Sequence, residues 1–111
     1  MVDTFKALAD QTRLRILSLF LDGADEMCVC EIEKCLQLTQ SNVSKHLAIL
    51  RNAGILSSKK HSQWVYYEVD EAFSNNNRDL VNFLKDKVKS LPTYEADKQS
   101  IEECKKSGLC K

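Results

Sequence analysis

The residues of this sequence with the most distinctive chemistry are its five cysteines. Cys28 and Cys30 form a Cys-x-Cys pair, Cys35 follows, and Cys104 and Cys110 lie near the end of the chain. Thiolate sulfur is a soft donor, favoured by arsenite, antimonite, Cd(II), Pb(II) and Zn(II). An odd number of cysteines cannot all pair within one chain, and the cytoplasm keeps thiols reduced. The pattern therefore indicates metal binding or redox sensing rather than a disulfide framework.

A second group of residues has the chemistry of DNA recognition. Carboxamides such as Gln40 and Asn42 pair with adenine, hydroxyls meet bases or phosphates, and cations such as Lys45 and Arg51 suit phosphates. His46 is expected to lie at the surface and contact phosphate rather than a metal. The candidate DNA contacts are Thr39, Gln40, Ser41, Asn42, Ser44, Lys45, His46, Arg51, Lys59, Lys60 and His61. The alternative is a solvent-exposed polar helix face.

The charge is distributed in a way that leaves both interpretations open. The chain has a formal net charge of zero, but residues 39–68 carry a net +3 and residues 22–38 a net −4. A basic middle preceded by an acidic stretch fits a DNA-binding face beside a different kind of site. Imbalances of this size are also common on solvated surfaces.

Hydrophobic spacing predicts which elements hold these residues. We expect a short first helix around Phe5 to Ala9, and a second that begins after the N-cap Asp10 and ends at Gly23. A short helix over 27–36 is then joined by a tight turn at 37–38 to a helix over 39–53. Two such helices joined tightly form a helix-turn-helix unit, whose second helix enters the major groove.

The pattern changes after Gly54 to that of a hairpin followed by a helix. Residues 55–60 and 64–69 read as two strands around His61, Ser62 and Gln63, which places Lys59, Lys60 and His61 on a wing. A long helix fits 72–90, and Pro92 stops it. From Thr93 the chain is polar and is expected to be frayed. The expected fold is mainly α with a β-hairpin, a winged helix-turn-helix.

Length and composition limit the class of protein. The 111 residues, 43% hydrophobic and 29% charged, predict one soluble domain over 1–91 and a Cys-containing polar tail over 92–111. No apolar run could span a bilayer and no signal peptide opens the chain, so we expect a cytoplasmic protein that does not bind membranes. The sequence has no phosphate-cradling glycine loop, no Cys-x-x-Cys and no nucleophile-base constellation. An enzyme is therefore not expected.

Four runs of sequence resemble the arsenic-resistance repressors of the ArsR/SmtB family. They are FKALADQTRLRIL at 5–17, MCVCEI at 27–32, QSNVSKHLAILRNAGIL at 40–56 and WVYY at 64–67. The resemblance covers roughly residues 3–91. It implies a homodimer that pairs its first and last helices and binds double-stranded operator DNA with inverted-repeat symmetry. It also implies release from DNA when arsenite or antimonite, the expected inducer, binds the cysteine thiolates.

The resemblance implies three ligands around arsenite, and only Cys28 and Cys30 are firm candidates. On an ideal helix their side chains stand about 200° apart, so we expect one ion to bind both only if the first helical turn distorts. Cys35, two turns beyond Cys28, is expected either as a buried apolar residue or as the third ligand. Cys104, Cys110, a small thiol and water remain open as alternatives.

The sequence departs from the family pattern at several places. Ser62 and Gln63 stand at the hairpin tip, where the family usually has Gly and then Arg or Lys, so the wing's contact with DNA is in question. Glu33 stands where a third cysteine often follows the Cys-x-Cys pair. No histidine lies on the last helix and no cysteine precedes Cys28, which disfavours the family's zinc and cadmium/lead sites. A Cd, Pb or Zn response, or a thiol-redox response, remains the alternative.

Overall fold

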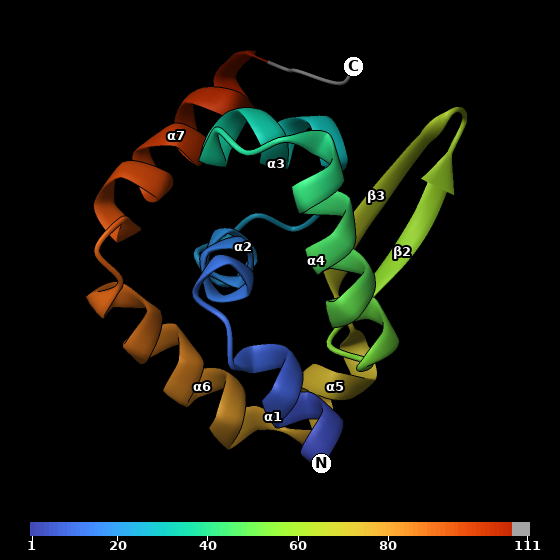
Figure 1. Ribbon diagram of the computed structural model, residues 1–111, viewed down its shortest axis with the longest axis vertical. Helices are drawn as coiled ribbons and strands as arrows, with labels where there is room; N and C mark the ends of the chain where they lie inside the picture. The colour runs from blue at the N-terminus through green and yellow to red at the C-terminus, as the bar shows by residue number, and fades with distance from the viewer. Residues whose placement is uncertain (108–111) are drawn as a thin grey trace.

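The computed structural model describes residues 1–107, in which one helix is surrounded by the others (Figure 1). The elements are α1 (Val2–Leu8), α2 (Gln11–Leu21), β1 (Met27–Cys28), α3 (Val29–Leu36), α4 (Gln40–Asn52), β2 (Leu56–His61), β3 (Trp64–Val69), α5 (Glu71–Asn76), α6 (Arg78–Lys87), a 3₁₀ turn η1 (Val88–Ser90) and α7 (Tyr94–Ser107). Helix α2 lies centrally, and its buried Ile16 and Leu19 belong to one core with Leu47 and Leu50 of α4. Burial of this apolar surface holds the layers together.

The helix-turn-helix unit consists of α3 and α4, as the sequence predicts. Thr39 caps α4, because its Oγ1 accepts a hydrogen bond from the backbone N–H of Asn42 at 3.3 Å. Asp10 caps α2 in the same way. Helix α3 ends at Gln37, whose φ of 55° turns the chain sharply into α4. The caps and this left-handed residue fix the angle at which the two helices meet.

The wing is a three-stranded antiparallel sheet in the order β1-β3-β2. The expected hairpin is confirmed to within a residue, with His61 opposite Trp64 and a two-residue turn of Ser62 and Gln63. Ser62 takes a φ of 58°, a conformation that glycine adopts at lower cost. The strand β1 was not expected, because Met27 and Cys28 were assigned to a helix; they instead pair with Tyr67 and Tyr66.

The long helix expected over 72–90 is wrong in one respect, since it is divided at Asn77. Asn77 has φ −136° and ψ 42°, and its Nδ2 donates to the carbonyl of Phe73 at 3.0 Å. Asparagine side chains compete with helical hydrogen bonds in this way. Helix α6 therefore starts in a new direction after α5. None of the helices within residues 1–107 is long and apolar enough to cross a membrane.

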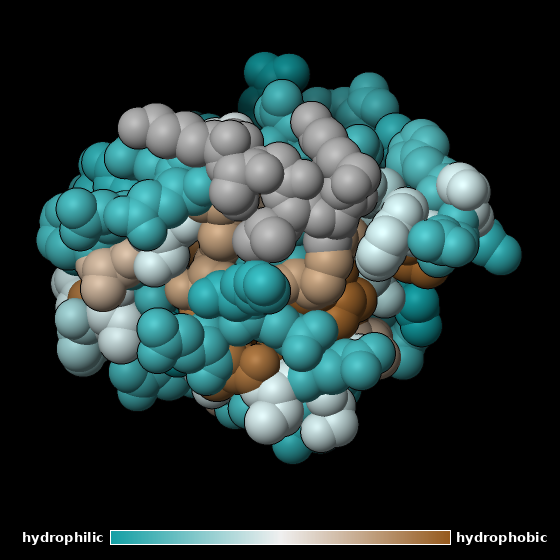
Figure 2. Space-filling model, turned by 90° about the horizontal axis from the view of Figure 1, so that it is seen from above, coloured by the Kyte–Doolittle hydropathy of each residue, from teal (hydrophilic) through white to brown (hydrophobic). Residues whose placement is uncertain are grey.

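The expectation of a frayed tail after Thr93 is wrong, because α7 packs beside α3 and against α2 (Figure 1). Arg15 and the buried Asp97 form a two-bond ion pair, with Nε to Oδ2 and Nη2 to Oδ1 both at 3.0 Å. Tyr94 donates its hydroxyl to Asp22 at 2.9 Å. Ile101 and Cys104 complete the buried side of the helix. Seen from the end of the molecule where α3 and α7 lie, the face is largely hydrophilic with hydrophobic residues showing between (Figure 2).

Candidate functional site

The thiols of Cys28 and Cys30 converge at the start of α3. Their Sγ atoms are 2.9 Å apart, so the expectation that they point to opposite sides is wrong. That expectation assumed a helix through both residues. Cys28 is instead the N-cap, with extended backbone at φ −88° and ψ 165°, which turns its side chain toward the second residue of the helix. No distortion of the first turn is required to bring the two sulfurs together.

Cys28 is fixed on both sides by backbone hydrogen bonding. Its N–H donates to Glu31 Oε1 at 3.0 Å, and its strand pairs with Tyr66 of β3. Cys28 is buried and Cys30 is half-buried, so solvent reaches the pair from the side of Cys30. The two cysteines therefore lie where the helix-turn-helix meets the sheet of the wing.

A cleft of about 370 Å³ opens directly beside the thiol pair. Its walls come from α3, from the first residue of α4 and from the wing: Cys28, Val29, Cys30, Glu33, Gln40, Trp64 and Val65. Trp64 and Val65 are 38% and 39% exposed, which is high for such apolar side chains. The sequence analysis missed Trp64 and Val65 as site residues, since only the pairing of β1 with β3 brings the wing to the thiols.

Cys35 and Cys104 form a second thiol pair, between α3 and α7. Both are buried, Cys35 has its thiol 3.7 Å from the carbonyl of Ser100, and it hydrogen-bonds to Cys104. Burial, with the contact to Cys104, raises the pKa of Cys35 far above its usual value. Cys110 lies outside the described residues. Within residues 1–107 no three His, Cys, Asp or Glu side chains are gathered as a metal site.

The polar residues expected to meet DNA lie mostly on one accessible surface of α4. Thr39, Gln40, Ser41, Ser44 and Lys45 are exposed and Asn42 is half-buried. Val43 and Leu47 between them are fully buried and anchor the helix. Arg51 is exposed in the last turn of α4. This arrangement can present amides, hydroxyls and a cation to a groove of DNA.

His46 is the exception, because its ring is buried and does not face solvent. Arg13 Nη1 donates to its Nδ1 at 3.1 Å, so this nitrogen carries no proton. Burial lowers the pKa of His46; the charges of Arg13 and Lys45 act in the same direction and Asp10 opposes them. The expectation that His46 lies at the surface is therefore wrong, and its ring instead contributes to the attachment of α4 to α2.

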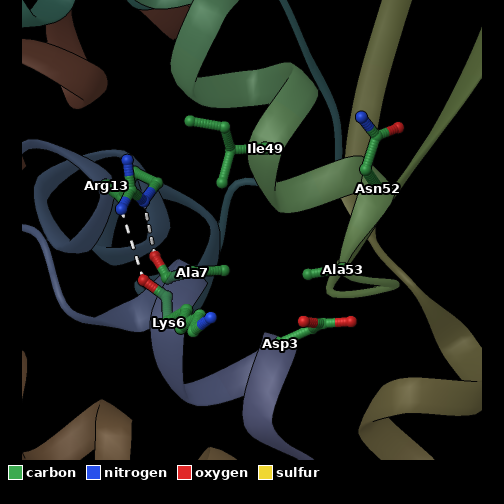
Figure 3. A pocket seen from close by; sticks show the side chains of 7 residues that line it. All are labelled: Asp3, Lys6, Ala7, Arg13, Ile49, Asn52 and Ala53. Atoms are coloured by element: carbon green, nitrogen blue, oxygen red, sulfur yellow. Dashed lines mark hydrogen bonds between the residues drawn. The ribbon is translucent and has the colours of Figure 1, made fainter.

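Arg13 connects three helices, and Figure 3 shows its two hydrogen bonds to α1. Its guanidinium donates to the carbonyls of Ala7, at 2.6 Å, and Lys6 at the end of α1. With the bond to His46, one side chain of α2 holds both α1 and α4. Ile49 and Asn52 of α4 line the cleft of about 340 Å³ beside it (Figure 3). The sequence analysis missed this role of Arg13, because it depends on a contact with His46, which lies 33 positions away in the sequence.

The cations of the wing differ in their surroundings. Lys59 Nζ is 3.1 Å from Glu68 Oε1, and this carboxylate raises the pKa of Lys59. Lys60 is exposed on the next position, and the His61 ring packs edge-on against Tyr66 with 5.4 Å between centroids. The wing therefore offers two exposed lysines, of which Lys59 is partly neutralised by Glu68.

An apolar groove of about 260 Å³ runs between α1, α2 and α6. Phe5 and Phe83 line it and are 54% and 56% exposed. Leu8, Leu80 and Leu84 form its base. Exposed apolar patches of this kind are typical of surfaces that contact another molecule.

Comparison with known proteins identifies relatives of this chain. Residues 10–58 match the family described as bacterial regulatory protein, arsR family. The arsenic resistance transcriptional regulator ArsR1 of Pseudomonas putida is 49% identical over 65 residues, which are 59% of this chain and 50% of the relative. A cadmium resistance regulatory protein homologue of Staphylococcus aureus is 40% identical over 68 residues, 60% of this chain and 54% of that protein. The matches span 50–58% of the length of three arsenic resistance relatives.

Solved structures share the fold. HlyU from Vibrio cholerae has a TM-score of 0.64 and 36% identity, with 75% of this chain and 85% of that chain covered. A homodimeric winged helix-turn-helix DNA-binding domain from Mycobacterium bovis also has a TM-score of 0.64, at 26% identity, with 77% of each chain covered. The expected winged helix-turn-helix fold is confirmed.

Proposed function

Because this chain belongs to the arsR family of bacterial regulatory proteins, we propose that it is a metalloid-responsive transcriptional repressor. As a homodimer it binds operator DNA through α4, and arsenite or antimonite releases it by binding the thiolates of Cys28 and Cys30. The observation that carries the proposal is the 2.9 Å contact between these two sulfurs, beside Gln40 of the recognition helix. Arsenic resistance regulators among the relatives support the choice of inducer.

The donor atoms suit a thiophilic ion. Two thiolates on one ion, with bonds of about 2.3 Å, hold their sulfurs roughly 3.7 Å apart. Cys28 and Cys30 therefore need to separate by only roughly 1 Å, which side-chain rotation at the half-buried Cys30 supplies. The relatives include a cadmium resistance regulator homologue as well as arsenic resistance regulators, and Cd(II) is the second candidate inducer.

The DNA-bound form is proposed as a dimer, with α1 and α6 at the interface. The exposed Phe5 and Phe83 support this choice, since pairing of the two copies would bury both. The solved relative from Mycobacterium bovis is described as homodimeric. Two recognition helices related by two-fold symmetry suit an inverted-repeat operator.

Thiol oxidation is a second way in which the same pair can act. Two sulfurs 2.9 Å apart need little movement to form a disulfide when an oxidant such as hydrogen peroxide is present. Oxidation and metalloid binding use the same two residues but respond to different reagents. The experiment must therefore be made on reduced protein with and without peroxide.

The test is fluorescence anisotropy of labelled promoter DNA with the reduced protein, titrated with arsenite, antimonite, Cd(II) or peroxide. Arsenite is expected to release the wild type and to leave Cys28→Ser/Cys30→Ser bound. Cys35→Ala is the matched control, because it removes a buried thiol elsewhere on α3 and is expected to keep the response. If the double variant still responds to arsenite, the sensing site is wrong. If the wild type never binds the DNA, the repressor function is wrong.

A further inference from the structure

The cleft beside the thiol pair is lined by side chains that are not needed to bind an ion to the two thiols. One wall is formed by apolar side chains, Val29 of α3 with Trp64 and Val65 of the wing, and another by the polar Glu33 and Gln40. An As(III) centre bound to Cys28 and Cys30, with one hydroxyl left, would fill only a small part of about 370 Å³. The remaining space suits an organic group with both an apolar and a polar part.

Among residues 1–107, no third sulfur lies beside Cys28 and Cys30 to bind the proposed inducer. No group of three possible ligands is present there. The two nearest alternatives, Cys35 and Cys104, are buried and contact each other between α3 and α7. To reach the pair at Cys28 either thiol would have to leave that interface, and burial already raises the pKa of Cys35. A ligand that enters through the open side of the cleft does not have to leave a buried interface first.

We propose that the cleft binds a low-molecular-weight amino-acid thiol, of the size of L-cysteine, which supplies the third sulfur to arsenite held by Cys28 and Cys30. This inference rests on the proposed function. Arsenous acid condenses with three thiols: three As–S bonds form, three As–O bonds break and three water molecules leave. Each thiol proton is taken up by a departing hydroxyl. Arsenic remains trivalent, so no oxidant or reductant is needed.

The walls account for the organic part of this co-ligand. Its methylene group lies against Trp64 and Val65, whose exposed apolar surface is then covered. Its ammonium group faces the carboxylate of Glu33, and its polar atoms meet the carboxamide of Gln40. Water or hydroxide in the third position would leave the apolar wall uncovered.

The position of the co-ligand also indicates how DNA is released. Gln40 is exposed, begins α4 and is a proposed base contact, yet it lines the same cleft as the thiols. A bound thiol would occupy space beside Gln40 that DNA must enter. Release then follows from steric exclusion at the start of the recognition helix, without unwinding of α3.

The experiment uses Cys110→Ser protein, reduced with a phosphine that contains no thiol, so that neither Cys110 nor the reductant can supply sulfur. Arsenite is titrated with and without millimolar L-cysteine and is followed by the fluorescence of Trp64, the single tryptophan. Native mass spectrometry identifies the adduct. We expect L-cysteine to tighten arsenite binding by about tenfold or more and to appear in the adduct with one arsenic. L-Serine is the matched control ligand, and it should have no effect.

Two outcomes overturn the inference while leaving the sensing site intact. One is an arsenic adduct whose affinity is unchanged by L-cysteine. The other is tight binding without added thiol in the wild type that is lost in Cys110→Ser, which would make Cys110 the third ligand. Val65→Asp, which places a carboxylate on the apolar wall, should abolish the gain from L-cysteine but keep arsenite binding. Failure of arsenite to bind under any condition would refute the proposed function as well.

Discussion

The ion pair between Arg15 and Asp97 should decide whether α7 belongs to the folded domain. Asp97→Asn keeps the size of the side chain and removes its charge. The variant leaves the Arg15 guanidinium, only 18% exposed, without its carboxylate, and also weakens the 2.9 Å bond from the Thr93 hydroxyl. Removing one partner of a buried pair costs about 3–5 kcal/mol. Since Arg15 keeps its bond to the carbonyl of Leu36, we expect about 3 kcal/mol, at the lower end.

The assay is urea unfolding and thermal melting of Asp97→Asn beside Glu95→Gln. Glu95 lies in the same first turn of α7, is exposed, and loses the same charge near the same helix N-terminus. The difference between the two variants therefore isolates the ion pair from the helix dipole. A loss of about 3 kcal/mol corresponds to a fall in Tm of roughly 12–20 °C for a domain of this size.

Amide hydrogen exchange separates local from global effects. If α7 detaches before the rest unfolds, exchange in residues 94–104 accelerates while the core around Leu47 stays protected. If Asp97→Asn and Glu95→Gln have the same Tm and the same exchange in α7, the ion pair contributes nothing and the reasoning is refuted.

Three further predictions concern titration, thiol reactivity and the wing. Because burial lowers the pKa of His46 from 6.5, the unfolded chain binds its proton at higher pH than the folded chain. Its contribution to stability should be complete above about pH 6.5 and be lost as pH falls through the folded pKa, and urea unfolding of His46→Gln should show a weaker dependence over that window. Cys35 should react with maleimide much more slowly in the native protein than in urea, measured with Cys28, Cys30, Cys104 and Cys110 replaced by serine; equal rates would contradict its burial. Lys60→Ala should reduce the slope of log K against log salt concentration for DNA binding by about 0.9. Lys59→Ala should change this slope less, because Glu68 partly neutralises the charge of Lys59. The reverse order would show that the wing is oriented differently on DNA.

The sequence was sufficient to predict the elements whose signals are local. The caps at Asp10 and Thr39, and the strand-forming residues of 64–69, are signals within one element and decided its type. The helix-turn-helix and the hairpin follow from them. The break at Asn77 was missed because a continuous apolar spacing outweighed the run of three asparagines at 75–77.

The features that sequence could not predict depend on contacts between distant residues. Helix α7 has few apolar residues, and its docking depends on Asp97, which meets Arg15 82 positions away. A charged residue in a polar stretch normally indicates solvent exposure. The sequence therefore indicated an exposed Asp97, whereas this residue is buried. Burial of His46 and convergence of Cys28 and Cys30 likewise follow from tertiary packing and from a strand of only two residues.

If Gln40, which lines the cleft of the thiols and begins α4, contacts DNA as proposed, the effector and the operator compete for one protein surface. Coupling between two binding events is reciprocal, so DNA weakens effector binding by the factor with which the effector weakens DNA binding. The effector concentration that releases the repressor then depends on the operator as well as on the protein. A repressor on a tight operator requires more effector for induction than the same repressor on a weak one. Promoters with graded operators would therefore switch on one after another as the effector accumulates.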